Sequence, residues 1–172
     1  MLICGSLRSG STNEALLRTV ASLLPSDIEA DLYDGMGALP HFNPDDDQDP
    51  LPPAVADMRS RIAAADAILF SIPEYAGAMP GSLKNLLDWT VGGTETSDKP
   101  VAWINISTSP NGAAKTHESL TTVLRYTGAN VIEAACVRLP VHRDAVGPQG
   151  LIDDASIEAE ILAAVTILLA AT

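Results

Sequence analysis

A buried strand that runs directly into a turn-rich loop is the feature that most constrains the fold of this chain. Residues 67–72 are apolar apart from Ser71, and their length suits one crossing of a sheet. Residues 73–81 then hold two prolines and two glycines, and an amphipathic helical pattern follows over residues 80–91. Loops of this kind lie at the carboxyl ends of strands, where open α/β sheets bind ligands. The segment therefore predicts a strand, a ligand-binding loop and a helix, in that order.

A second loop with the same placement lies near the start of the chain. Residues 1–4 predict a short strand, residues 5–13 a loop of small and hydroxyl-bearing residues, and residues 12–24 a helix. Two such loops, each at the carboxyl end of a strand, indicate one shared ligand.

The remaining sequence alternates between strands and helices in the same way. Five strands alternating with five helices predict a parallel sheet covered on both faces. Right-handed crossovers favour a doubly wound, flavodoxin-like α/β fold with strand order 2-1-3-4-5, whose switch point lies between strands 1 and 3. Both ligand-binding loops leave these two strands. The expected strands are residues 1–4, 28–33, 67–72, 101–107 and 129–139, the last interrupted near Glu133, and the expected helices are residues 12–24, 53–65, 80–91, 111–127 and 155–171.

Length and charge narrow the classes of function. A chain of 172 residues suits a single domain, 1–172, with one good core. The net charge of −12 argues against nucleic acid and against an anionic membrane surface, because both need clustered Lys and Arg. No signal peptide opens the chain, and its longest apolar tract, residues 161–171, is too short to span a bilayer. We therefore expect a soluble, cytoplasmic protein.

Neither cysteine nor acidic clusters predict a metal site. Cys4 and Cys136 both fall in expected strands, where they suit small buried positions rather than a disulfide. The acidic run 45–49 lacks the glycine and the glutamate that an EF-hand loop requires, so it is typical of a solvated loop. The three histidines are far apart and lack ligand spacing.

The first loop has the composition of an anion site. Free amides and the helix dipole attract anions where such a loop opens a helix. Ser6, Ser11 and Asn13 can donate hydrogen bonds, and Arg8 adds a planar positive charge. Ser11 with Glu14 also fits the capping box S-x-x-E, which explains Ser11 alone. The loop predicts phosphate binding, with helix capping as the alternative.

Two nucleotide motifs are absent from this loop. A P-loop needs Lys directly after its second glycine, and Ser11 stands there after Gly10. The dinucleotide fingerprint G-x-G-x-x-G is absent too. These absences argue against an NTPase.

The second loop has the composition of a platform for a planar ligand. Tyr75 is the only aromatic residue placed to meet one, and Gly77 and Gly81 allow close backbone approach. Glu74 has the chemistry of a general base, but a structural hydrogen bond to backbone is the better interpretation. In the helix that follows, Lys84 and Asp88 predict a surface salt bridge.

Together the two loops resemble a known family, the NADPH-dependent FMN reductases, which include bacterial quinone, azo-dye and chromate reductases. The family pattern is roughly G-S-x-R-x-x-S-x-N followed by P-E-Y-N-x-x-x-P-G-x-L-K-N-x-x-D-W. The matching residues here are Gly5-Ser6-Leu7-Arg8 with Ser11 and Asn13, then Pro73-Glu74-Tyr75, Pro80-Gly81, Leu83-Lys84-Asn85 and Asp88-Trp89.

The resemblance implies a site for FMN. Carried over by position, the FMN phosphate is held by Ser6, Arg8, Ser11 and Asn13. The isoalloxazine edge and the ribityl chain are lined by Pro73, Glu74, Tyr75 and Gly77, and Ser107 and Gly112 meet the ring from the strand 4 side.

The resemblance also implies the activity. NADPH or NADH passes hydride to the flavin N5 atom, and the flavin then reduces a quinone, an azo dye, a metal oxyanion or free flavin by two electrons in ping-pong exchange. The flavin performs the redox step, so no catalytic side chain and no metal is expected. Family members form homodimers or homotetramers, with the helix after the second motif at the interface.

Three departures from the family pattern stand out. Ala76 replaces the usual Asn, the strand before Gly5 is short, and Ala113-Ala114-Lys115 replaces a segment that often holds more glycine and an arginine.

Two other functions stay open. A flavodoxin-like electron carrier suits the fold and the acidic surface, but carriers usually sandwich the flavin between aromatic rings, and aromatic residues make up only 4% of this chain. An interaction protein that kept the fold and lost the cofactor is the third possibility.

Overall fold

Five parallel strands lie in the predicted order, β2-β1-β3-β4-β5, in the computed structural model, which describes residues 1–172. This arrangement confirms the flavodoxin-like order, and β1 and β3 are neighbours at the switch point. The strands are β1 (Leu2–Cys4), β2 (Leu32–Tyr33), β3 (Ile68–Ser71), β4 (Pro100–Asn105) and β5 (Asn130–Val131).

A sixth strand, β6 (Val137–Arg138), also pairs with β4, so the sheet has one strand more than predicted. A 3₁₀ turn at Glu133–Ala135 divides the expected strand 129–139, at the position where the sequence predicted an interruption. β5 pairs with the first residues of β4 and β6 with its last residues. The turn thus carries the chain out of the sheet and returns it beside the same neighbour.

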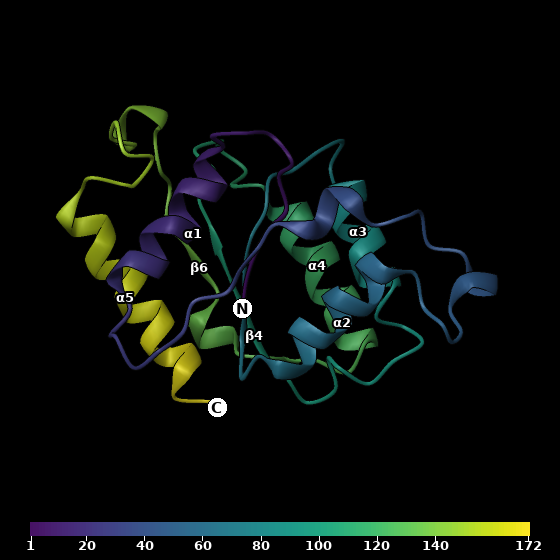
Figure 1. Ribbon diagram of the computed structural model, residues 1–172. Helices are drawn as coiled ribbons and strands as arrows, with labels where there is room; N and C mark the ends of the chain where they lie inside the picture. The colour runs from purple at the N-terminus through teal and green to yellow at the C-terminus, as the bar shows by residue number, and fades with distance from the viewer.

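Helices cover both faces of the sheet (Figure 1). One layer holds α1 (Thr12–Leu23) and α5 (Ala155–Leu169). The other holds α2 (Pro53–Ala64), α3 (Gly81–Asp88) and α4 (Ala114–Tyr126). Each layer buries its own apolar cluster against the sheet, one of 17 residues under α1 and α5 and one of 18 under the other three helices. Burial of this much apolar surface is the main stabilising term of the fold.

The second strand is shorter than the sequence predicts. The alternating pattern predicts residues 28–33, but only Leu32–Tyr33 pair, because β2 is an edge strand whose one neighbour, β1, has three residues. Two 3₁₀ turns, Gly35–Ala38 and Pro44–Asp46, follow in the long loop.

The acidic run in this loop is exposed, as predicted, at every residue except Asp47, which turns inward. The carboxylate of Asp47 pairs with Arg59 of α2 at 2.6 Å, and both side chains are about nine-tenths buried (10% and 11% exposed). Arg59 also donates to the Trp89 carbonyl oxygen at 2.7 Å. Trp89 itself is fully buried in the core (0% exposed).

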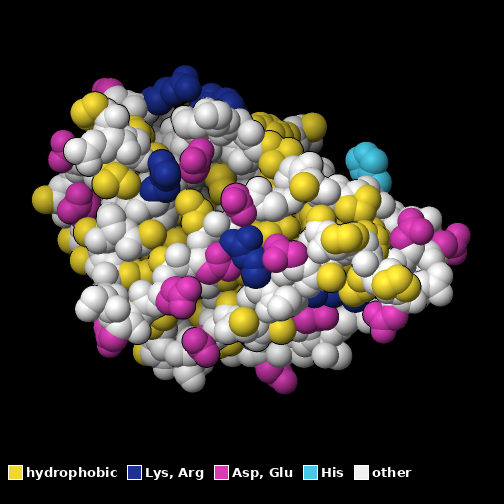
Figure 2. All heavy atoms as spheres, viewed as in Figure 1, with side chains coloured by type: hydrophobic (Ala, Val, Ile, Leu, Met, Phe, Trp, Pro, Cys, Tyr) yellow, Lys and Arg dark blue, Asp and Glu magenta, His cyan; other side chains and the backbone are white.

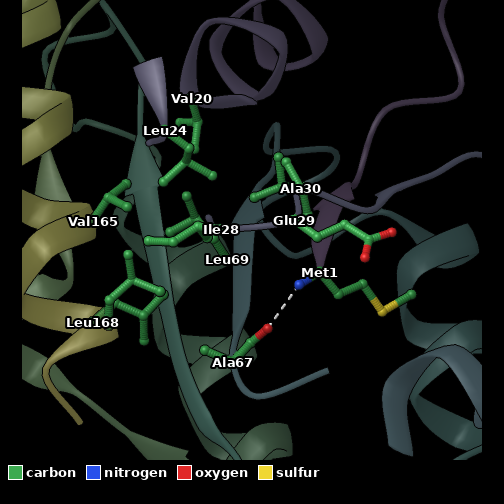
Figure 3. A pocket seen from close by; sticks show the side chains of 12 residues that line it. Met1, Val20, Leu24, Ile28, Glu29, Ala30, Ala67, Leu69, Val165 and Leu168 are labelled. Atoms are coloured by element: carbon green, nitrogen blue, oxygen red, sulfur yellow. Dashed lines mark hydrogen bonds between the residues drawn. The ribbon is translucent and has the colours of Figure 1, made fainter. Parts of the chain in front are cut away.

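The amino end of the sheet carries a small apolar hollow (Figure 3). The Met1 amine donates to the Ala67 carbonyl oxygen at 2.9 Å at its edge. Val20 of α1, Leu24 directly after that helix, and Val165 and Leu168 of α5 form part of its lining. None of the helices combines the length and apolar character that a membrane crossing requires.

Candidate functional site

A cleft of about 400 Å³ opens at the carboxyl end of the sheet, among the loops that follow β1, β3 and β4. Its volume lies within the ~300–1,000 Å³ range of small-molecule sites. Of the residues predicted for the ligand site, Asn13, Pro73, Glu74 and Ser107 line it. The rest of the lining is Thr12, Ile72, Ile106, Thr108, Ser109 and Ala113.

The other large hollows are unsuited to an anionic ligand. A hollow of about 580 Å³ at the amino end of the strands is lined by Asp27, Glu29, Asp31 and Asp66, among others. Carboxylates also line the hollow of about 660 Å³ beside the run 45–49. Their charges repel a phosphate. The apolar hollow of Figure 3 measures only about 50 Å³.

Ser11 caps α1, which confirms the capping interpretation. The Glu14 backbone N–H donates to Ser11 Oγ at 3.1 Å. The Gly10 N–H donates to Glu14 Oε2 at 3.2 Å, so this carboxylate bends back over the loop. Thr12 and Asn13 occupy the first turn of the helix, where backbone N–H groups have no intrahelical acceptor. Both residues line the cleft, and free amides at a helix N-terminus are suited to an anion.

A buried hydroxyl fixes the side chain of Asn13. Ser71, which is fully buried at the end of β3, donates from Oγ to Asn13 Oδ1 at 3.0 Å. The same Oγ lies 3.3 Å from the Ile104 carbonyl oxygen. Because the Asn13 oxygen accepts this hydrogen bond, its NH₂ group remains as a donor. Sequence reasoning missed Ser71 as a site residue, although a single polar residue within an apolar strand was the available signal.

Ser6 and Arg8 lie on the other side of the first loop. They line a hollow of about 220 Å³ between this loop and the end of β2, together with Cys4 and Glu14. The Arg8 backbone N–H donates to Ser6 Oγ at 3.3 Å, and the Arg8 side chain is exposed. Burial raises the pKa of the Cys4 thiol, which therefore stays protonated. The structure does not bring Ser6 and Arg8 into the cleft with Asn13, and their contact with a phosphate stays a prediction.

The second loop contains a two-residue hairpin. Tyr75 and Ala78 exchange backbone hydrogen bonds of 3.0 and 3.1 Å. Between them Ala76 and Gly77 both have positive φ, 51° and 75°, which is the geometry of a type I′ turn. Such turns prefer Asn-Gly, so the departure at Ala76 places a Cβ where the backbone disfavours it. Tyr75 is 54% exposed at the rim, and neither it nor Gly77 lines the cleft.

Three hydrogen bonds fasten the second loop to α4. Glu74 Oε2 accepts from the Thr116 N–H at 3.4 Å, and Thr116 Oγ1 donates to the Pro73 carbonyl oxygen at 3.3 Å. The Met79 N–H donates to Ser119 Oγ at 3.3 Å. The residue before α4 is Ala113, which has no side chain to cap the helix, so Glu74 supplies the missing acceptor. The predicted structural hydrogen bond of Glu74 is thereby confirmed.

The third loop, residues 106–113, is held from behind by Asn105. Asn105 Nδ2 donates to the Gly112 carbonyl oxygen, and its Oδ1 accepts from the Ser107 N–H at 2.9 Å. Ser107 Oγ donates to Ser109 Oγ at 3.0 Å. Gly112 is buried and does not line the cleft. It packs against Arg138 so closely that a Cβ there would lie 2.5 Å from Arg138 Nε. Ser107 therefore reaches the cleft as predicted, and Gly112 shapes the loop.

His117 lies buried below this loop. Its Nδ1 lies 2.8 Å from the Ala113 carbonyl oxygen, and its Nε2 has no partner. Burial lowers its pKa, so the ring is neutral at pH 7 and Nδ1 carries the proton that the carbonyl accepts. The Trp103 ring packs against it, with 5.8 Å between ring centroids.

The cleft fits a mononucleotide with a flat ring. Amides of Thr12 and Asn13 provide donors for a phosphate on one side. Ile72, Pro73 and Ile106 provide apolar walls, and Ser107 and Thr108 add hydroxyl groups.

Comparison with known proteins agrees with this geometry. Residues 1–142 match the family of NADPH-dependent FMN reductases. An NAD(P)H-dependent FMN reductase of Pseudomonas aeruginosa is 37% identical over 159 residues, which cover 91% of this chain and 85% of that protein. A 2-hydroxy-1,4-benzoquinone reductase of a Burkholderia species is 39% identical over 128 residues, covering 73% of this chain and 69% of that one.

Solved structures share the fold over nearly the whole chain. The flavoenzyme NAD(P)H:(acceptor) oxidoreductase FerB of Paracoccus denitrificans superimposes with a TM-score of 0.84 and 29% identity, covering 98% of this chain and 96% of that one. Flavodoxin 1 of Bacillus cereus shares the fold alone. It is 18% identical, with a TM-score of 0.57, and the match covers 98% of this chain and 95% of that one. The chain therefore belongs to the NADPH-dependent FMN reductase family, a family of flavin-dependent oxidoreductases, as its two loop motifs predict.

Proposed function

We propose that this protein is an NAD(P)H-dependent, FMN-containing reductase of small-molecule acceptors, quinones above all. The observation that carries the proposal is the meeting of three loops in one cleft: Asn13 from the first, Pro73 and Glu74 from the second, and Ser107 from the third. The relatives named as FMN and quinone reductases support the same reaction class.

Each loop has a distinct task in this proposal. The first-turn amides and the Asn13 NH₂ group hold the phosphate, and Ser71 keeps that NH₂ group oriented. Pro73, Ile72 and Ile106 exclude water from the ring, and Ser107 hydrogen-bonds its polar edge. FMN held in this way would supply the redox chemistry, a two-electron transfer from NAD(P)H to the acceptor.

No side chain in the cleft is needed as an acid or base. Glu74 is engaged with the Thr116 N–H, and the only buried histidine is neutral and bonded to a carbonyl. The chain's contribution is therefore placement. With a single open cleft, donor and acceptor bind in turn, which gives ping-pong kinetics.

Steady-state kinetics of the FMN-loaded protein test the proposal. We expect NAD(P)H oxidation in the presence of a quinone and parallel lines in double-reciprocal plots. Bound flavin without NAD(P)H oxidation would favour the electron carrier, and a protein that binds no FMN would favour an interaction protein.

Homo-oligomer formation stays a prediction. Tyr126 at the end of α4 and Val91 just after α3 are the most exposed large apolar side chains, at 90% and 65%. Sedimentation velocity of the parent and of a Val91→Glu, Tyr126→Glu variant tests whether they lie in an interface.

A further inference from the structure

Unpaired basic side chains gather at the loop end of this acidic molecule. The chain has ten Lys and Arg against 22 Asp and Glu, and its ion pairs involve only Arg59, Arg61, Lys84 and Arg125 among the basic residues. Figure 2 shows a group of basic side chains along the upper edge, where Figure 1 places the loops, and mostly acidic charged side chains over the rest of this face. The basic residues without an acidic partner at the carboxyl end of the sheet are Arg8, Lys115, Arg138 and Arg143.

Backbone pairing beyond β6 continues beside the cleft as far as Val141, two residues before Arg143. The Leu139 N–H donates to the Asn105 carbonyl oxygen at 2.8 Å, and the Val141 N–H donates to that of Ile106 at 3.1 Å. Ile106 lines the cleft, so the chain after β6 runs along its outer wall. Arg143 follows two residues later, exposed at the start of a 3₁₀ turn.

Arg138 is held against the back of the same wall. Its Nη2 donates to the Ser109 carbonyl oxygen at 2.8 Å, and its guanidinium packs against Gly112. The side chain is exposed, and no other hydrogen bond engages its remaining N–H groups. Arg138 therefore has a fixed position and free donors, which is the condition for recognising an anion.

The nearby carboxylates do not neutralise these two arginines. Glu14 and Glu74, on the other loops of the cleft, accept hydrogen bonds from Gly10 and Thr116. Asp144, next to Arg143 in the chain, is exposed and forms no ion pair with it. The charge of both guanidinium groups is thus directed to solvent beside the cleft.

Resting on the proposed function, we propose that Arg138 and Arg143 bind the pyrophosphate of the reducing dinucleotide. A ligand that suits this site has two parts. Its redox-active ring enters the cleft, and its anionic group stays outside, beside the cleft wall formed by Ser107–Ser109. NADH and NADPH have this shape, because two phosphates separate the nicotinamide from the adenosine. A neutral quinone has no group for these arginines. The two side chains hence recognise the donor and leave the acceptor unaffected.

Three single variants test the proposal in the FMN-loaded protein. Arg143→Gln and Arg138→Lys probe the site, and Arg18→Gln is the control, since Arg18 is exposed on α1 without an ion pair. We expect Arg143→Gln to raise the KM for NADH and NADPH about fivefold to tenfold, which corresponds to about 1–1.4 kcal/mol for one solvent-exposed hydrogen-bonded contact. Arg138→Lys keeps the positive charge but loses the planar pair of guanidinium N–H donors, so we expect the same KM values to rise about twofold to fivefold. In Arg143→Gln the KM for a neutral quinone and the FMN affinity remain at parent values, whereas Arg138→Lys, whose side chain holds the third loop at Ser109, is compared for the dinucleotide KM alone.

Reduced nicotinamide riboside separates the pyrophosphate from the nicotinamide end. It carries no phosphate, so its KM is expected to change less than twofold in Arg143→Gln. Titration of the oxidised dinucleotide into the FMN-loaded protein gives the same comparison without turnover, and raised salt should weaken the parent more than the variant.

The outcomes separate the two proposals. Equal KM changes for NADH and for the riboside, or kinetics of Arg143→Gln that match Arg18→Gln, overturn the arginine site while the reductase activity stands. A parent protein that binds FMN but oxidises neither dinucleotide overturns the proposed function itself.

Discussion

Glu74 Oε2 accepts a hydrogen bond from the Thr116 backbone N–H at 3.4 Å, which joins the second loop to the first turn of α4. The same turn follows the third loop, whose last residue, Ala113, cannot cap the helix. Two of the three cleft loops are thus tied together, whereas the first loop is closed mainly on itself through Ser11 and Glu14. We expect the two sides of the cleft to respond differently to substitution.

Glu74→Ala should loosen the second and third loops together. The variant removes the acceptor at the helix N-terminus, a loss that typically costs about 0.5–1 kcal/mol of unfolding free energy at an exposed position. Because both loops line the cleft, FMN affinity should fall about threefold to tenfold. Urea unfolding and flavin fluorescence titration measure the two effects. Glu74→Gln keeps an acceptor oxygen and should recover most of both; an identical loss in Gln and Ala variants would contradict capping.

Ala76→Asn should stabilise the protein. Ala76 has a φ of 51° and precedes Gly77 in a type I′ turn, a position at which Asn is strongly preferred over Ala. We expect a gain of about 0.5–1 kcal/mol, or about 1–4 °C in Tm for a chain of this length. Differential scanning calorimetry with FMN absent measures it. As the opposite test, Gly77→Ala adds a second strained Cβ and should lower Tm; a rise in that variant would argue against the turn.

Ser71 and Asn13 should act as a unit in FMN binding. Ser71→Ala removes the donor that fixes Asn13 Oδ1, so the Asn13 amide loses its orientation. Each single variant, Ser71→Ala or Asn13→Ala, should lower FMN affinity about tenfold, the worth of about 1.4 kcal/mol. Since both act through the same amide, the double variant should lose little more than either one. Flavin titration of the four proteins measures the coupling, and additive losses would show two independent contributions.

The sequence predicted the strand order and both cleft loops because these follow from apolar runs, turn residues and handedness, which are local properties. It could not predict the extent of β2, since that depends on the three residues that β1 offers as a partner. It also placed Ser6 and Arg8 with Asn13, because a sequence shows that residues share a loop but not which side of it they face. Ser71 was overlooked for a similar reason: its role depends on Asn13, 58 residues away.

His117 should make the stability of the protein depend on pH below about 6.5. Burial lowers its pKa from the ordinary 6.5, so the unfolded chain takes up a proton at higher pH than the folded protein does. The free energy of unfolding should therefore be independent of this group above about pH 7.5 and fall as the pH drops through 6.5 toward the folded pKa. His117→Gln should remove this part of the decline, whereas His41→Gln, at an exposed position, should keep it. Urea unfolding at pH 7.5 and 5.5 measures the loss of unfolding free energy between these two pH values. An equal loss in the parent and in His117→Gln would show that the buried ring does not titrate in this window.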